Sequence, residues 1–235
     1  MRSDRQSNQT LIKLRSALKR VADPRRAPEM QRYMKSVIPY HGVPLPVCRR
    51  VFKHTFADLE FDGANSWKTT VLYIWRNARF REEWYAAIAL CESRKADPFQ
   101  TPLALPLYEE MIVGGAWWDI VDPIASHCVG KLLRRYPVRM ARSMRTWSRS
   151  PDMWKRRTSI LCQLGFKQST DLQLLYSCIE PSLNSREFFL QKAIGWALRQ
   201  YAWTNPEEIR RYIRSHEDRL SALSKREALR NIGRA

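Results

Sequence analysis

Residues 188–202 read Phe-Phe-Leu-Gln-Lys-Ala-Ile-Gly-Trp-Ala-Leu-Arg-Gln-Tyr-Ala, and their apolar side chains recur at three- and four-residue steps. This spacing predicts a helix. Asn184 followed by Glu187 is a capping pattern for its start. Gly195 inside this helix costs about 1 kcal/mol relative to alanine. We therefore expect another part of the chain to approach closely at Gly195 and Trp196 to project from the packed surface.

The same helical spacing extends over most of the chain. Leu11, Leu14, Leu18 and Val21 predict one helix that ends before Pro24. Further helix starts are marked by Ser150-Pro151, Asn205-Pro206 and a capping box of Ser224 with Glu227, the last helix ending at Gly233. No alternating stretch with hairpin turn residues stands out, so the sequence predicts an all-α fold.

A weak internal repeat organises these helices. Aromatic residues open comparable helices at Trp84, Trp117, Trp154 and Phe189, at separations of 33, 37 and 35 residues. A period of this size with helix pairs throughout is typical of an α-solenoid, and at about 40 residues per pair the chain holds about six HEAT-like pairs. We expect the basic helices to line a concave groove that wraps part of a DNA duplex.

Positive charge is concentrated in two stretches of this 235-residue chain, which has 41 Lys and Arg, 23 Asp and Glu, and a net charge of +18. Residues 131–167 contain eleven Lys and Arg with Asp152 as their one acid, and residues 1–35 contain ten with three acids. A single basic run is ordinarily a solvated face, but this concentration predicts a polyanionic partner. Nucleic acid is the first candidate and an acidic membrane surface the second.

Several classes of protein are disfavoured. The chain has 8 glycines and neither a GxGxxG nor a GxxxxGK[ST] motif, so no nucleotide cofactor is expected. Residues 1–20 lack the apolar core of a secretory signal, and no apolar run approaches the roughly 20 residues of a spanning helix. The five cysteines form no CxxC pair and the four histidines have no metal-ligand spacing. Reduced thiols, no metal and a cytoplasmic location are expected, on the nucleoid if the source is bacterial.

The most informative segment for chemistry is 109–122, which ends Trp-Trp-Asp-Ile-Val-Asp. Asp119 and Asp122 are three residues apart and share a helix face, and Trp118 is one turn from Asp122. The simplest interpretation makes Trp117 and Trp118 core aromatics and Asp119 a cap. Two adjacent tryptophans cannot both face the core of one helix, however, so one is expected to face a groove.

A second segment is Trp154-Lys155-Arg156-Arg157. Lys155 and Arg156 are either a solvated basic face or contacts to a nucleic-acid backbone, as are Lys192 and Arg199 in residues 188–202.

These motifs together resemble a known family. Trp-Trp-Asp-x-Val-Asp at 117–122, an arginine 35 residues further on, and Phe-Phe-x-Gln-Lys-Ala-Ile-Gly-Trp-x-Leu-Arg at 188–199 are similar to the AlkD-type DNA alkylation-repair glycosylases. Arg-Tyr-Met-Lys at 32–35 and Leu-Ser-Lys-Arg-Glu-Ala at 223–228 add to the resemblance. It covers residues 28–235, predicted to form a single HEAT-like glycosylase domain. Residues 1–27 have no counterpart and are expected to form a basic, partly helical N-terminal extension.

The resemblance implies removal of positively charged N3- and N7-alkylpurines from duplex DNA, without metal, nucleotide, lyase step or deep base pocket. We expect a monomer, because one solenoid can cover one lesion. By position, Asp122 matches the family's catalytic aspartate. Trp118 and Trp196 match its two cleft tryptophans, and Arg157 matches its phosphate-contacting arginine. Tyr33 matches a tyrosine near the lesion, and Lys35 lies beside it as a further DNA contact.

One departure and several rival interpretations remain. Pro44 stands where a polar residue able to touch DNA is expected. Asp119 could share or replace the role of Asp122, since spacing does not separate them. The strongest rival is a non-catalytic HEAT-repeat module that binds nucleic acid by shape and charge. A protein–protein scaffold, a membrane-surface protein and a Cys/His hydrolase have weaker support.

Overall fold

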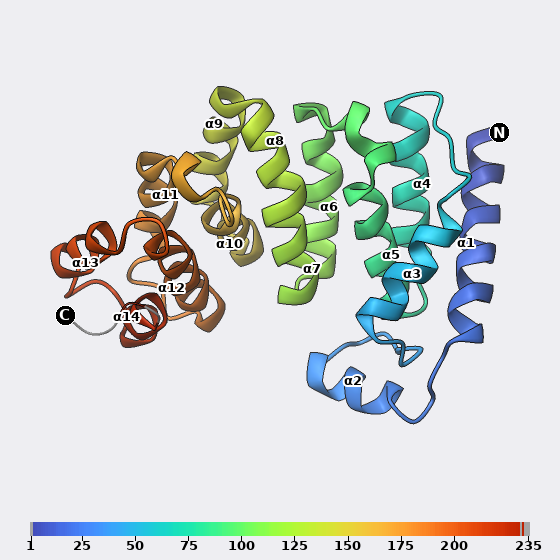
Figure 1. Ribbon diagram of the computed structural model, residues 1–235, viewed down its shortest axis with the longest axis horizontal. Coiled ribbons are helices and arrows are strands. Elements are labelled where there is room, and N and C mark those ends of the chain that lie inside the picture. The colour runs from blue at the N-terminus through green and yellow to red at the C-terminus, as the bar shows by residue number, and fades with distance from the viewer. Residues whose placement is uncertain (1, 231, 233–235) are drawn as a thin grey trace. The chain divides into compact units, whose positions relative to one another are not determined.

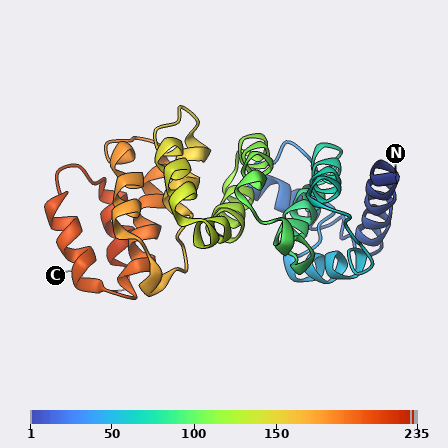
Figure 2. The same ribbon diagram turned by 90° about the horizontal axis from the view of Figure 1, so that it is seen from above.

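The computed structural model describes residues 2–230 and 232, and every regular element in these residues is a helix (Figures 1 and 2). The all-α prediction is confirmed. The chain forms two compact units, Met1–Gln100 and Thr101–Ala235.

Unit 1 is a bundle of five α-helices. They are α1 (Arg2–Arg20), α2 (Ala27–Met34), α3 (Leu45–Thr55), α4 (Ala64–Arg76) and α5 (Arg81–Glu92), followed by a 3₁₀ turn at Arg94–Phe99. Trp67, Val71 and Ile74 of α4 are completely buried and form the centre of its core.

Helix α1 is part of this packed body. Leu14 and Leu18 are completely buried, and α1 packs against both α3 and α4. Arg15 donates from Nε to Glu83 Oε1 of α5 at 3.0 Å, and the Glu83 side chain is itself fully buried. The apolar stripe of α1 is therefore covered by the rest of unit 1, and the expected division of the chain at residue 27 stays a prediction.

Unit 2 contains the remaining α-helices. They are α6 (Leu105–Gly115), α7 (Trp118–Pro123), α8 (Gly130–Arg135), α9 (Pro137–Trp147), α10 (Met153–Leu161), α11 (Leu172–Ile179), α12 (Phe188–Ala202), α13 (Pro206–Ser215) and α14 (Ala222–Leu229), with a π-helical segment, Ile124–Val129, joining α7 to α8. Helix α6 lies beside α7 and α8 in both views (Figures 1 and 2).

Two layers of helices can be followed through unit 2. Helix α7 with its π-helical continuation packs on α10, α10 on α12, and α12 on α14. We call these helices the Asp122 layer. The other helices of the pairs, α9, α11 and α13, form the second layer, in which α9 packs on α11. Between the layers lies a continuous apolar core that includes Leu161, Ile179, Leu190, Leu198 and Ile209.

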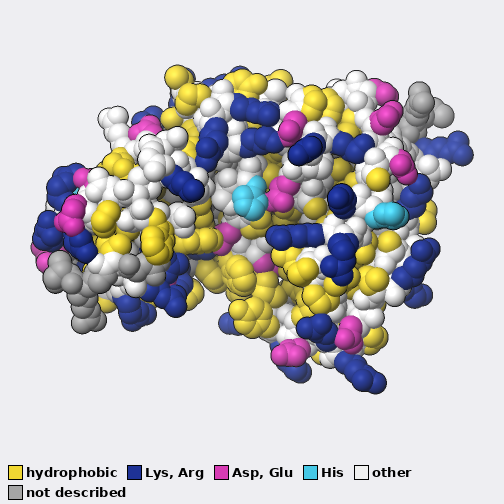
Figure 3. Space-filling model, in the orientation of Figure 1, with side chains coloured by type: hydrophobic (Ala, Val, Ile, Leu, Met, Phe, Trp, Pro, Cys, Tyr) yellow, Lys and Arg dark blue, Asp and Glu magenta, His cyan; other side chains and the backbone are white. Residues whose placement is uncertain are grey.

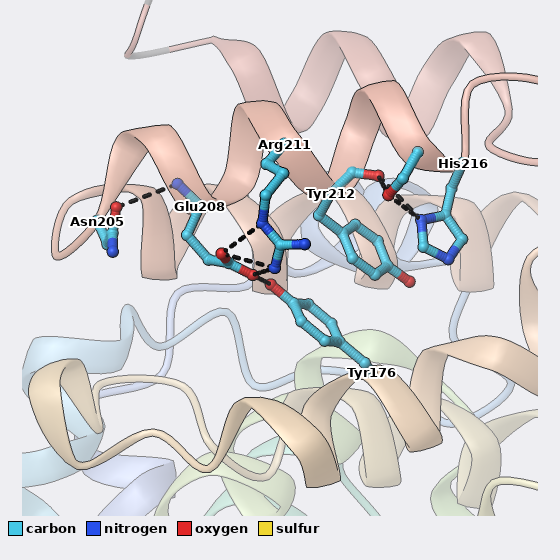
Figure 4. A network of polar contacts seen from close by, with 7 residues as sticks. Tyr176, Asn205, Glu208, Arg211, Tyr212 and His216 are labelled. Atoms are coloured by element: carbon cyan, nitrogen blue, oxygen red, sulfur yellow. Dashed lines mark hydrogen bonds and ion pairs between the residues drawn. The ribbon is translucent and has the colours of Figure 1, made fainter.

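A stack of rings and a polar network join α11 to α13 in the second layer (Figure 4). The Tyr176 and Tyr212 rings are stacked with their centroids 4.1 Å apart, and His216 stacks on Tyr212 at 4.2 Å. The Tyr176 hydroxyl donates to Glu208 at 2.7 Å, and Arg211 donates to both oxygens of the same carboxylate. One carboxylate at the start of α13 therefore fixes α13 to α11.

The repeat predicted from aromatic spacing has a physical counterpart in unit 2. The ring centroids of Trp117, Trp154 and Phe189 lie 5.1–6.2 Å from one another in a single cluster. The aromatic residues at equivalent positions of successive helix pairs are thus in contact with one another. Trp84, the first aromatic of the series, lies in unit 1, where it stacks on Trp75 at 4.7 Å.

The predicted helix starts have mixed outcomes. Asn205 caps α13 by accepting from the Glu208 backbone N–H at 3.1 Å, as predicted. Helix α10 is capped by Asp152 rather than at Ser150-Pro151, and α12 follows Glu187 without a side-chain cap. The predicted capping box at Ser224 is wrong, because the cap of α14 is Ser221. The predicted stop at Gly233 lies outside the described residues.

Three further features concern the described residues as a whole. All five cysteines are buried and free of disulfides, and burial raises the pKa of the Cys48 thiol to about 12 and that of Cys178 to about 11. Along residues 2–230 and 232, no helix is both long and apolar enough to cross a bilayer. Lys and Arg side chains are spread over the visible face, with few acidic side chains between them (Figure 3).

Candidate functional site

The turn between α6 and α7 places the first site residues. Ala116 ends α6 in the left-handed region (φ 37°, ψ 39°) and donates its N–H to Ile112 O. Trp117 is extended, and its carbonyl accepts from the N–H groups of Ile120 and Val121. The new helix therefore begins at Trp118, with the Trp117 ring turned into the aromatic cluster.

Asp122 follows one turn into α7, at an irregular point of the helix. The next residue is Pro123, which has no N–H to donate, and the chain continues as the π-helical segment Ile124–Val129. The Ser126 hydroxyl donates to the Asp122 carbonyl at 2.7 Å. Single π-helical turns are often found at functional sites. Our sequence interpretation missed this segment, and Pro123 was the signal that could have indicated it.

Asp122 and Arg157 of α10 form a two-point ion pair. Arg157 Nε donates to Asp122 Oδ1 at 2.7 Å, and Nη2 donates to Oδ2 at 2.8 Å. The side chains are only 11% and 5% exposed, respectively. This fork geometry is the strongest arrangement available to a carboxylate and a guanidinium.

The third nitrogen of Arg157 is also engaged. Nη1 donates to the backbone carbonyl of Phe189, at the start of α12, and the guanidinium carbon lies 5.9 Å from the centroid of the Phe189 ring. The rings of Trp117 and Trp154 complete the surroundings of Phe189. Arg157 thus connects α7, α10 and α12, and its orientation is fixed by groups on both sides.

Arg157 has partners inside the protein. All three guanidinium nitrogens donate to Asp122 or Phe189, and little of the side chain is exposed. In this structure Arg157 holds the Asp122 carboxylate, and the contact to a DNA phosphate that the resemblance implied stays a prediction.

Burial raises the pKa of the Asp122 carboxyl above its ordinary value. The hydrogen bonds and positive charge of Arg157 oppose that effect, and the negative charge of Asp119 adds to it. Asp119 is therefore linked to the site through its charge. The Asp122 side chain keeps about a tenth of its surface exposed, so it is not completely sealed from solvent.

The two predicted tryptophans lie on helices of the Asp122 layer. Trp118 is the first residue of α7, one turn before Asp122, and is half-buried. Trp196 is half-buried on α12, two turns after Phe189 on the same face, or roughly 10 Å along the helix. Neither makes a hydrogen bond or ring contact with Asp122 or Arg157 in the part of the chain that the structure describes.

The close approach predicted at Gly195 is confirmed. A Cβ atom at this position would lie 2.5 Å from Glu227 Cβ and 2.8 Å from Ser224 O, both in α14. Only glycine lets α14 pack this tightly on α12, and this packing holds the Trp196 backbone in place.

Comparison with known proteins identifies the family of the chain. The family model described as DNA alkylation repair enzyme matches residues 14–232. The chain belongs to this family.

Solved structures support the assignment of the fold. A predicted DNA alkylation repair enzyme from Enterococcus faecalis is 26% identical, with a TM-score of 0.81 over 91% of this chain and 98% of that one. An alkylpurine DNA glycosylase, AlkC of Pseudomonas fluorescens bound to DNA with an abasic-site analogue, is 14% identical. Its TM-score is 0.57 over 95% of this chain and 62% of that one, which is a likeness of helical fold alone. No curated protein matches the sequence.

The predicted DNA contacts on α12 of this family member have a partner inside the protein. Lys192 Nζ lies 3.0 Å from Glu227 Oε1, and Arg199 Nη1 lies 2.9 Å from Glu227 Oε2. The Lys192 hydrogen bond is the main reason why the pKa of the Glu227 carboxyl is lowered. Sequence reasoning had assigned Glu227 to a cap and missed this role.

The predicted DNA contacts on α10 are likewise engaged. Lys155 pairs with Glu109 of α6 and lies 5.2 Å over the ring of Trp147. Arg156 donates to the Ser182 hydroxyl from Nε at 3.2 Å and from Nη2 at 3.0 Å. Both side chains therefore have structural partners, and their assignment to DNA stays a prediction.

Tyr33 and Lys35 lie in unit 1, at the end of α2. Tyr33 is 75% exposed, and Lys35 is the exposed cap of α2 in the left-handed region with φ 48°. Pro44 precedes α3, where its carbonyl accepts from the Val47 and Cys48 N–H groups. Within the described ranges, no group of three or more His, Cys, Asp or Glu could hold a metal ion.

Proposed function

We propose that this chain is a monofunctional DNA glycosylase of the AlkD type. It hydrolyses the N-glycosidic bond of positively charged N3- and N7-alkylpurines in duplex DNA. The observation that carries the proposal is the Asp122 carboxylate, held by Arg157 at 2.7 and 2.8 Å with about a tenth of its side chain exposed, in a member of the DNA alkylation repair enzyme family.

The chemistry suits a single carboxylate. Alkylation at N3 or N7 places a positive charge on the purine and weakens its bond to C1′ of the sugar. When this bond breaks, its electron pair neutralises the purine, so no general acid is needed. The sugar is left with oxocarbenium character, which the ionised Asp122 stabilises. Water then bonds to C1′ and releases a proton, giving a neutral alkylated base and an abasic site.

Arg157 acts as a positioning residue in this mechanism. It aims the carboxylate and favours its charged form before substrate arrives, which is the preorganisation that electrostatic catalysis requires. Trp118 and Trp196 would attract the cationic nucleotide through their ring faces, each contributing about 0.5–2 kcal/mol. Selectivity would then come from the charge of the lesion rather than from a deep pocket that reads the base.

Release of free bases from methylated duplex DNA tests the proposal. Wild type should release 7-methylguanine or 3-methyladenine, and Asp122→Asn should lose about 10²–10³ in single-turnover rate while still binding DNA. Asp119→Asn is the matched control and should keep most of the rate. Loss in Asp119→Asn alone would transfer the catalytic role to Asp119.

Lesion charge provides a second test. A duplex containing hypoxanthine, which is neutral, should not be processed at a comparable rate. If wild type binds alkylated DNA but releases no base, the non-catalytic nucleic-acid-binding module is the better description.

A further inference from the structure

Helix α9 of the second layer carries a row of arginines. Arg139, Arg142, Arg145 and Arg149 are spaced three or four residues apart, so they share one side of the helix and its C-terminal extension. Three of them are exposed and Arg145 is half-buried. We call these four residues the arginine ridge.

The ridge differs from four other cations of unit 2 in having no ion-pair partner among the described residues. Arg157, Lys155, Lys192 and Arg199 each pair with an acidic side chain. No member of the ridge has an ion-pair partner among residues 2–230 and 232, and the one side-chain bond within it runs from Arg149 Nη1 to the Arg145 carbonyl. The ridge therefore keeps its full positive charge for an external partner.

The ridge also points away from the candidate catalytic residues. The opposite side of α9 carries buried Met140, Met144 and Trp147, and this side packs against α8, α10 and α11. On α10, Lys155 reaches toward Trp147 of α9, whereas Arg157, two residues on, points to Asp122. Residues two apart do not share a helix face. The ridge and Asp122 thus lie on different sides of unit 2.

An open hollow of about 680 Å³ lies at the C-terminal end of the ridge. Its lining includes Arg142, Arg145 and Arg149, together with Trp147 and Lys155, and the Lys155 side chain pairs with Glu109. Asp152, which follows Pro151 of the lining, accepts from the Lys155 backbone N–H at 2.8 Å. The hollow is suited to anionic groups that several guanidinium groups contact together.

We propose that the arginine ridge is a second binding surface for the backbone of duplex DNA, separate from the site at Asp122. From Arg139 to Arg149 the helix and its C-terminal extension rise roughly 15 Å, which is about the length of four base pairs along a duplex axis at 3.4 Å each. The row of guanidinium groups is therefore long enough to contact more than one phosphate of the duplex. One protein molecule can then hold two DNA segments, one at each side of unit 2. The choice of duplex DNA rests on the family assignment and does not require excision at Asp122.

The test compares two variants that lose the same charge. Arg139→Gln/Arg142→Gln/Arg149→Gln removes three exposed members of the ridge, and Arg186→Gln/Arg214→Gln/Arg226→Gln removes three exposed arginines elsewhere in unit 2. A third variant with lysine at the ridge positions keeps the charge. Circular dichroism checks that each protein is folded.

In the main measurement, protein is first bound to an immobilised duplex, and the capture of a second, labelled, unmodified duplex is then measured. Sedimentation shows whether the protein is monomeric under the same conditions. Wild type, the lysine variant and the control variant should capture the second duplex. The ridge glutamine variant should capture at least tenfold less of it. The slope of log affinity against log salt should also become shallower by roughly 0.9 for each lost phosphate contact.

Three results would overturn the proposal. One is undiminished capture by the ridge glutamine variant. Another is a loss of single-turnover base release in the ridge glutamine variant, at saturating enzyme, that is as large as its loss of capture. This result would mean that the ridge binds the same duplex that carries the lesion. The third is capture of phosphatidylserine vesicles but not of duplex, which would make the ridge a membrane contact. If wild type released no base, the glycosylase proposal would be wrong. The capture measurement would still test the ridge, because it uses unmodified DNA.

Discussion

Asp122 and Arg157 are joined by two parallel hydrogen bonds of 2.7 and 2.8 Å, although 35 residues separate them in the chain. Arg157 is held in turn by the Phe189 carbonyl. The direction and charge of the one buried carboxylate in the candidate site therefore depend on three helices at once. The pKa of the Asp122 carboxyl therefore depends on neighbouring charged residues, and substitution of these residues should change it.

Base release should fall as pH is lowered through the raised pKa of Asp122, because the protonated carboxyl cannot stabilise a cationic sugar. Arg157→Gln should move this acid limb to higher pH, since the guanidinium opposes the effect of burial. Asp119→Asn should move it to lower pH, since the Asp119 charge raises the same pKa. Single-turnover release across pH, corrected for release without enzyme, measures both shifts. Shifts in the same direction would contradict the assignment.

Protonation of Asp122 at low pH should stabilise the fold, although it abolishes activity. A carboxyl whose pKa is raised by folding binds a proton more tightly when folded than when unfolded. Its ionised form costs stability above the folded pKa, and this cost disappears as pH falls through that pKa. Loss of activity on the acid side therefore should precede unfolding, which circular dichroism at the same pH values can verify.

The pair should behave as a unit in unfolding experiments. Asp122→Leu alone or Arg157→Met alone leaves one buried charge without its partner and should destabilise the protein by about 3–5 kcal/mol. The double variant removes both charges and should recover most of that loss while remaining inactive. Urea unfolding of the four proteins measures the coupling. A double variant whose loss equals the sum of the single losses would show that the two side chains act independently.

Local sequence patterns account for the helices but not for the contacts that build the site. Helical spacing placed Asp119 and Asp122 on one face, and the aromatic period brought Trp117, Trp154 and Phe189 together. No spacing rule joins Asp122 to an arginine on another helix. That pairing depends on how α7 and α10 pack, and the resemblance gave the residues without their mutual contact.

The wrong capping box shows the same limit. Ser224 and Glu227 have the right spacing for a cap, yet the Ser224 hydroxyl donates to the Gln191 carbonyl of α12 and Glu227 pairs with Lys192 and Arg199. Both side chains have partners on α12, and the residue that caps α14 lies three positions earlier, at Ser221. A local motif identified residues that matter but assigned them the wrong role.

The N-terminal helix should be required for the stability of unit 1. Leu14 is completely buried between α1 and its neighbours, so Leu14→Ala should lower the free energy of unfolding by about 2–5 kcal/mol. Ile12, which is 57% exposed on the same helix, provides the control, and Ile12→Ala should have little effect. Thermal unfolding measures both. If Leu14→Ala only weakened DNA affinity, the helix would be the separate basic extension that the sequence suggested.

Gly195→Ala should destabilise the protein even though alanine is the better helix former by about 1 kcal/mol. The new Cβ would lie 2.5 Å from Glu227 Cβ and 2.8 Å from Ser224 O, so α14 has to move away from α12. Overpacking of this kind costs about 1–3 kcal/mol and would also separate Glu227 from Lys192 and Arg199.

Gly63→Ala is the matched control for this variant, because no atom lies within 4 Å of a Cβ at that position and its φ of 171° is ordinary extended backbone. Urea unfolding should show a loss for Gly195→Ala and a much smaller change for Gly63→Ala. Base release should fall in Gly195→Ala as well, since displacement of α14 also releases the α12 backbone that carries Trp196. A stabilised Gly195→Ala protein with unchanged activity would show that α14 can yield to an added methyl group without disturbing the site.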